Sequence, residues 1–75
     1  MNVKGLRVLV VGMAKSGIAS AALLASEGAF VTINDKKTRN ELPEALKALD
    51  GVNYADALGA DPLALLDDTD MIVLS

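Results

Sequence analysis

A loop bounded by glycines is the part of this sequence whose residue types and spacing could bind a charged ligand. Gly12-Met13-Ala14-Lys15-Ser16-Gly17 follows a short β-branched run and precedes a stretch rich in Ala and Leu. At such a strand-to-helix junction, Gly12 permits a tight turn and Gly17 lets the helix pack against the strand. The free N–H groups and the dipole of the first helical turn favour an anion such as a phosphate.

The interior of the loop adds to this predicted anion site. Ser16 supplies a hydroxyl donor and Lys15 a mobile cation. Ala14 stands where dinucleotide-binding loops carry a middle glycine, which argues against the closest approach of a pyrophosphate. The loop also differs from a Walker A loop, because its Lys-Ser pair precedes the final glycine instead of following it.

A carboxylate follows at the distance expected for a nucleotide site. Asp35 ends the next predicted strand, 23 residues after Gly12. A carboxylate there could accept hydrogen bonds from a ribose hydroxyl or a base N–H group, and Lys36 and Lys37 could face a phosphate. The plainer interpretations are a strand-end turn residue and two solvated lysines.

The elements that must position these residues follow from hydrophobic spacing. Strands are predicted over residues 6–11, 30–34, 52–54 and 71–74, and a helix over 16–27. Its expected apolar face is Ile18, Ala21, Ala22 and Ala25, widened by Leu23 and Leu24. Gly28 is expected as its left-handed C′ residue.

Helix signals also occur between the later strands. Asn40 is a candidate cap for a second helix that has Pro43 in its first turn and stops at Gly51. Its expected buried stripe is Leu42, Ala45, Leu46 and Leu49. Asp61-Pro62 predicts a cap and first position for a short helical turn over 63–66.

This alternation predicts a Rossmann-like α/β fold with a parallel sheet of about four strands in the order 3-2-1-4 and flanking helices. Residues 1–75 form one predicted domain. We expect it to be truncated, because the loop after the fourth strand, where α/β sites usually lie, is missing. The free edge strand of such a domain could pair with a second copy.

Composition excludes several classes of function. The 75 residues contain no Cys and no His, which rules out disulfide scaffolds, thiolate zinc sites and Cys or His catalysis. Residues 1–47 carry a net charge of +3 and residues 48–75 one of −6. The basic residues are not interleaved with aromatics, so nucleic acid is a poor candidate partner. The acidic 67–70 segment is expected to be a solvated loop rather than a metal site.

Targeting signals are also lacking. The apolar run before Gly12 is too short for a signal peptide, and no stretch is long enough to span a bilayer. We therefore expect a cytoplasmic protein that does not contact membranes.

The glycine loop, the 31–35 run Val-Thr-Ile-Asn-Asp, and the 59–67 segment Gly-Ala-Asp-Pro-Leu-Ala-Leu-Leu-Asp resemble the N-terminal domain of the Mur ligases of peptidoglycan synthesis. Asp61 stands where that family usually has His. The resemblance is closest to members that add D-glutamate to UDP-N-acetylmuramoyl-L-alanine. It implies a small-molecule UDP-sugar partner and an N-terminal UDP-substrate-binding domain over residues 1–75.

Carried over by position, the resemblance assigns the UDP moiety to Gly12, Ala14, Lys15, Ser16, Gly17, Asp35, Lys36, Lys37 and Ser75. Lys36 departs from the Asp-Thr-Arg form of some members. In the family, ATP and Mg²⁺ bind to a central domain and D-glutamate to a C-terminal one. The resemblance therefore implies no catalytic residue, metal or cofactor within these 75 residues, and no catalysis by the chain alone.

Two other functional interpretations of the glycine loop remain open at this point. A glycine turn followed by Asp35 also fits an NAD(P)-binding domain of an oxidoreductase, or a non-enzymatic NAD-sensing module. Both prefer a glycine where this sequence has Ala14, and neither predicts the Ala-Lys-Ser run.

Overall fold

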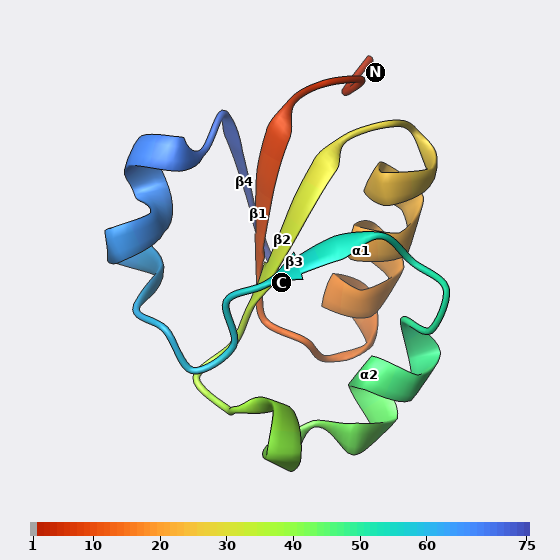
Figure 1. Cartoon of the computed structure of the whole chain (residues 1–75), viewed down its shortest axis with the longest axis vertical. Helices are drawn as coiled ribbons and strands as arrows, with labels where there is room; N and C mark the ends of the chain where they lie inside the picture. The colour runs from red at the N-terminus through yellow and green to blue at the C-terminus, as the bar shows by residue number, and fades with distance from the viewer. Residues whose placement is uncertain (1) are drawn as a thin grey trace.

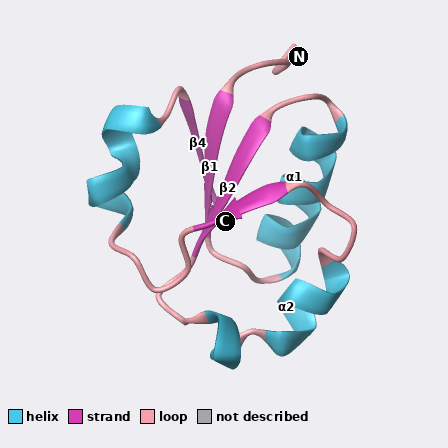
Figure 2. Cartoon of the chain, viewed as in Figure 1, coloured by secondary structure: helices cyan, strands magenta, loops and turns pink. Residues whose placement is uncertain are grey.

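The computed structural model describes residues 2–75, and its strands form one four-stranded parallel sheet (Figures 1 and 2). The strands, in the spatial order β3-β2-β1-β4, are β1 (Arg7–Val11), β2 (Phe30–Asn34), β3 (Tyr54–Asp56) and β4 (Met71–Leu74). The predicted α/β class and the predicted strand order are both confirmed. Val11 pairs with Asn34 on one side and with Leu74 on the other. The carboxyl ends of β1, β2 and β4 therefore meet at one edge, called here the carboxyl edge.

Helices cover the two sides of the sheet unequally. α1 (Lys15–Ser26) and α2 (Pro43–Ala48) lie on one side, and the 3₁₀ helix η2 (Pro62–Asp68) lies on the other (Figure 1). A short 3₁₀ helix, η1 (Arg39–Glu41), precedes α2. None of the helices in residues 2–75 has the length and apolar character needed to cross a membrane.

The core lies between the sheet and α1. Alternate strand residues point to this side, and they pack in one buried cluster with Ala21 and Leu24 of α1. Those strand residues are Val8, Val10, Val31 and Ile33. The prediction for Leu23 is wrong, because its side chain is 60% exposed. At about 100° per residue, Leu23 lies about 200° around the helix from Ala21 and so faces solvent.

The two glycines that bound the loop have separate steric roles. Gly12 has φ +98°, a left-handed conformation that a side chain would strain. Gly17 lies so close to the preceding turn that a Cβ atom on it would sit 1.8 Å from the carbonyl oxygen of Gly12. The predicted role of Gly17, close packing of helix against strand, is confirmed.

The third predicted strand and the second helix begin elsewhere than expected. The third strand starts at Tyr54, because the N–H of Val52 donates to the carbonyl of Leu49 in a turn (2.9 Å). Asn40 does not cap α2 but lies inside η1, whose own cap is a reciprocal box between Thr38 and Glu41. Asn40 is therefore one turn too early to cap the helix that Pro43 begins.

Other local predictions hold. Gly28 follows α1 with φ +89°, and Ala45 and Leu49 are buried as expected. The Asp61 carboxylate accepts from the N–H of Leu63 (3.0 Å), with Pro62 at the first position of η2.

The β4 edge of the sheet exposes apolar side chains. Ile72 is 45% exposed and Leu74 is 80% exposed, on the side that carries only η2. Self-association through this edge stays a prediction.

Gly17→Ala tests the close approach of α1 to the turn. Helix propensity alone would favour Ala by about 1 kcal/mol. The Cβ clash with a backbone carbonyl should instead lower the free energy of unfolding by about 3 kcal/mol or more, measured by urea denaturation. Ala19→Gly, at an exposed position of the same helix, is the control and should cost about 1 kcal/mol. A Gly17→Ala variant as stable as the wild type would contradict this packing.

Candidate functional site

The start of α1 leaves backbone donors free at the carboxyl edge. Ala14 is the N-cap of α1, and no side chain caps the helix. The first intrahelical bond runs from the N–H of Ile18 to the carbonyl of Ala14 (3.0 Å). The N–H groups of Lys15, Ser16 and Gly17 therefore have no intrahelical acceptor, and the first two of these residues are exposed. Such a helix start can bind an anion.

The Asp35 carboxylate fixes the glycine loop to the end of β2. Its Oδ2 accepts from the N–H of Met13 (2.8 Å), and its Oδ1 accepts from the N–H of Lys37 (2.9 Å). Both bonds favour the ionised carboxyl, and they hold the pKa of Asp35 below its ordinary value, with the bond from Lys37 the larger cause. Asp35 therefore positions two backbone segments, whatever else it contacts.

The neighbouring residue, Asn34, holds a second segment in place. Its side chain is buried, with 1% exposure, and its Nδ2 donates to the carbonyls of Ala57 and Ala60, both at 2.9 Å. The turn over residues 57–60 is also bonded to β2 through the N–H of Gly59, which donates to the carbonyl of Asp35 (2.8 Å). The pair Asn34-Asp35 thus anchors the glycine loop on one side and the 57–60 turn on the other.

Ser75 comes to the glycine loop from the end of β4. Its Oγ lies 2.5 Å from Ser16 Oγ, and its N–H donates to the carbonyl of Val11 (3.0 Å). A Cβ built on Gly12 or on Gly17 would meet the Ser75 Cβ at 3.3 Å. Ser16 and Ser75, 59 residues apart, are therefore brought together as neighbours at the carboxyl edge.

These segments line an open pocket of about 390 Å³, called here the edge pocket. It is lined by Val11, Gly12, Asn34, Asp35, Lys36, Lys37, Ala60, Pro62 and Ser75. Two of its three ionisable side chains are lysines, so its lining carries a small positive charge in a chain of net charge −3. A negatively charged group is favoured there over a cation.

Lys15 borders a different pocket. A hollow of about 540 Å³ lies between the start of α1 and the η1–α2 segment, and Lys15 lines it together with Lys37, Glu41 and Glu44. Lys15 and Lys37 are both exposed, and Lys37 lines both pockets. The structure therefore places the predicted site residues around the glycine loop, with Lys15 on the helix side and Asp35 on the edge-pocket side.

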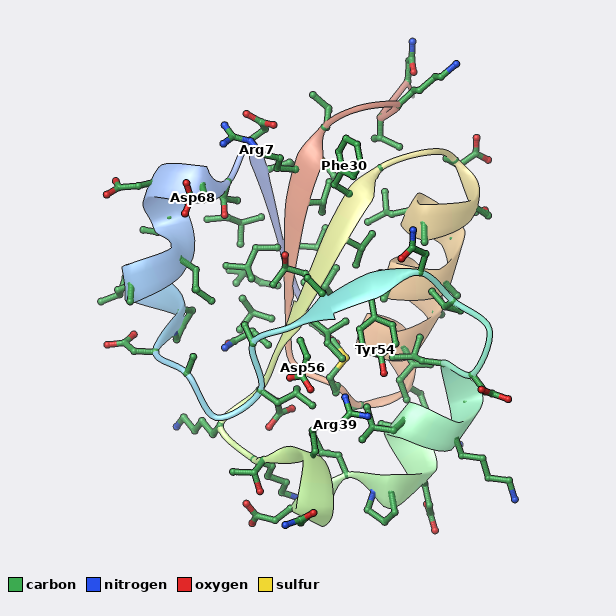
Figure 3. All side chains as sticks on the ribbon, viewed as in Figure 1. Arg7, Phe30, Arg39, Tyr54, Asp56 and Asp68 are labelled. Carbon is green, nitrogen blue, oxygen red and sulfur yellow. The ribbon has the colours of Figure 1, made fainter. Side chains whose placement is uncertain are left out.

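Arg39 forms an ion pair away from the edge pocket. Its Nη1 lies 2.6 Å from Oδ2 of Asp56, which joins η1 to β3 (Figure 3). The pKa of Asp56 is lowered by the N–H of Leu58 and, next, by this guanidinium. Arg7 makes the matching pair with Asp70 at the opposite edge of the sheet, at 3.1 Å.

Sequence analysis missed Asn34 as a site residue. An Asn at the end of a strand is common in turns, and its two acceptors lie 23 and 26 residues further along the chain. The only local signal is a polar residue that follows Ile33 at the last position of a predicted strand, where burial requires a hydrogen-bond partner.

Comparison with known proteins gives one consistent result. No family model matches the chain. The chain is 49% identical over 69 residues to UDP-N-acetylmuramoylalanine–D-glutamate ligase of Shouchella clausii, covering 92% of this chain and 15% of that protein. The ligase of the same name from Lactiplantibacillus plantarum is 48% identical over 69 residues, which cover 91% of this chain and 15% of that protein.

A third relative matches the whole chain. The ligase of the same name from Geotalea daltonii is 40% identical over 75 residues, which are 100% of this chain and 17% of that protein. The chain therefore spans about one-sixth of the length of these curated relatives, and the matched part is an N-terminal fragment.

Asp35→Asn tests the anchoring role of the carboxylate. An amide has one accepting oxygen, so the variant can keep only one of the bonds from Met13 and Lys37 and turns an NH2 group toward the other donor. The free energy of unfolding at pH 7 should therefore fall by about 1–2 kcal/mol. Because the pKa of Asp35 is lowered in the folded state, its contribution is present above the unfolded pKa of about 3.9 and is lost as pH falls through the folded value. The difference between wild type and variant should therefore shrink under acid. Asp50→Asn, at an exposed residue after α2, is the control and should leave the urea midpoint nearly unchanged. A pH-independent difference would contradict this role.

Proposed function

Because this chain is homologous to an N-terminal fragment of the UDP-N-acetylmuramoylalanine–D-glutamate ligases, we propose that it binds the UDP portion of the sugar-nucleotide substrate. The whole protein would then join D-glutamate to UDP-N-acetylmuramoyl-L-alanine in peptidoglycan synthesis. Residues 1–75 would be its Rossmann-like substrate-binding domain.

One observation carries this proposal: the uncapped start of α1 adjoins the edge pocket through the contact between Ser16 and Ser75. The N–H groups of Lys15 and Ser16 supply donors for the diphosphate, and the α1 dipole favours its charge. The edge pocket, with Asp35, Lys36 and Lys37 on its wall, receives the nucleoside end. Ser75 closes the site from β4, where its hydroxyl adjoins that of Ser16.

The chain's contribution is binding and orientation. Amide formation in such a ligase is driven by ATP with Mg²⁺, and the proposal assigns both to parts of the longer protein outside this segment. The side chains at the carboxyl edge hold the nucleotide end, so that the carboxylate at the far end of the substrate extends toward the other domains. The isolated 75-residue chain should accordingly form no product.

A ligand titration tests the proposal directly. Adding UDP-N-acetylmuramoyl-L-alanine to the ¹⁵N-labelled chain should shift the backbone amide signals of residues 15–17 and 35–37 in a saturable manner, because these groups line the proposed contacts. NADH should shift them far less. The reverse preference would favour an NAD-binding domain and reject the ligase proposal.

Lys15→Glu tests the charge at the helix start. Lys15 is exposed, so the variant should keep the wild-type circular dichroism and urea midpoint. Replacing a cation by an anion beside a diphosphate should weaken binding by about tenfold or more at low salt. Lys4→Glu makes the same charge change before β1, at the opposite edge of the sheet, and should leave affinity nearly unchanged. Equal affinities for wild type and Lys15→Glu would remove Lys15 from the site.

A further inference from the structure

We propose that Asn34 is a positioning residue of the edge pocket, whose Nδ2 holds the 57–60 turn as one wall and whose Oδ1 accepts a hydrogen bond from the nucleoside end of the ligand. The identity of the ligand rests on the proposed function. The role of Asn34 in holding the 57–60 turn does not rest on the proposed function, because it follows from contacts within the chain.

The orientation of the amide is fixed by its partners. Both hydrogens of Nδ2 are used, since it donates to the carbonyls of Ala57 and Ala60, and a carbonyl cannot donate to an amide oxygen. Asn34 is the last residue of β2 and points to the side of the sheet opposite Ile33, away from the α1 core. Only an amide or another double donor satisfies two carbonyls from this position.

Asn34 stands between the two walls of the pocket. Its backbone carbonyl accepts from the N–H of Gly12 (2.8 Å), which holds the glycine loop. Its side chain holds Ala60, which lines the pocket opposite that loop. The gap between the walls is therefore set by the length of one residue, and a shorter side chain would release the 57–60 turn.

The oxygen of the same amide is available to a ligand. Within residues 2–75, no donor to Asn34 Oδ1 is found, yet no buried side-chain nitrogen or oxygen atom there lacks a partner. Asn34 is 1% exposed, and it is one of the residues that line the edge pocket. A carboxamide oxygen at this place suits an N–H or O–H donor of a base or ribose.

Hydrogen exchange tests the wall-holding part without any ligand. In Asn34→Ala, the backbone amide of Gly59, which is bonded to Asp35, should exchange about tenfold faster than in the wild type, since the turn loses two hydrogen bonds. Asn34→Ser leaves a single donor on a side chain too short to reach both carbonyls, so it should also speed the exchange of Gly59. Thr32→Val changes a half-buried residue on the same side of β2, away from the edge pocket, and should leave Gly59 unchanged. Wild-type exchange at Gly59 in both Asn34 variants would overturn the inference.

A selectivity measurement tests the ligand-contacting part. UDP and ADP share the diphosphate and the ribose but differ in the base, so their affinity ratio reports on the pocket rather than on overall stability. Asn34→Ala should weaken UDP by about tenfold and ADP by less, lowering the ratio, while Thr32→Val should preserve it. An unchanged ratio would overturn this part. If the wild-type chain binds no UDP, the proposed function is wrong. The exchange rates of Gly59 would then still test whether Asn34 holds the 57–60 turn.

Discussion

The hydrogen bond from the N–H of Met13 to the carboxylate of Asp35 is the contact on which the geometry of the carboxyl edge depends. A parallel sheet aligns the ends of β1 and β2, but it does not fix the loops that leave them. This bond, 2.8 Å long, ties the loop after β1 to the residue after β2. The ionised state of Asp35 is favoured by the same donors, so the strength of the anchor and the lowered pKa have one cause. The bond between Gly12 and the carbonyl of Asn34 then sets the loop against the strand.

Acidic residues in the second half of the chain also accept hydrogen bonds from backbone N–H groups. Asp56, Asp61 and Asp70 each accept from a backbone N–H, and two of them also pair with an arginine from the first half. These carboxylates lie within 15 residues of one another in sequence but bond to different segments: Asp56 and Asp61 to the turns that follow them, and Asp70 to the start of β1. The acidic residues of this half therefore do not form one site. The acidic residues of the second half thus serve local bonds, while Lys15, Lys36 and Lys37 of the first half line the two pockets.

The parts of the fold that the sequence predicted correctly depend on local chemistry. The apolar runs define three of the strands within a residue, Gly17 follows from the strand-to-helix junction, and the Asp61-Pro62 cap follows from two adjacent residues. The wrong predictions occur where a local hydrogen bond that the sequence pattern did not reveal determines the backbone conformation. Thr38 and Glu41 form a capping box that places Asn40 inside η1, and the turn after α2 delays the third strand.

The candidate site was predictable only in part for the same reason. The glycine loop and Asp35 are recognisable by spacing, but the role of Asn34 depends on carbonyls more than twenty residues away. That Lys15 and Asp35 border different pockets depends on which way the loop turns, and no pattern in the sequence encodes that direction.

The residue at the start of α1 links stability to binding. A Ser or Asp at the N-cap would satisfy one of the free N–H groups internally and would stabilise the helix by about 1 kcal/mol. Ala14 forgoes that stabilisation, since its methyl group accepts no hydrogen bond. The same donors are then free to meet an anion, and binding one supplies the cap that the chain lacks. Asp35, Gly17 and Asn34 hold the surrounding backbone in place without a ligand, so little reorganisation opposes binding. On this view Ala14, which departs from the dinucleotide pattern, is a feature suited to a helix capped by its ligand.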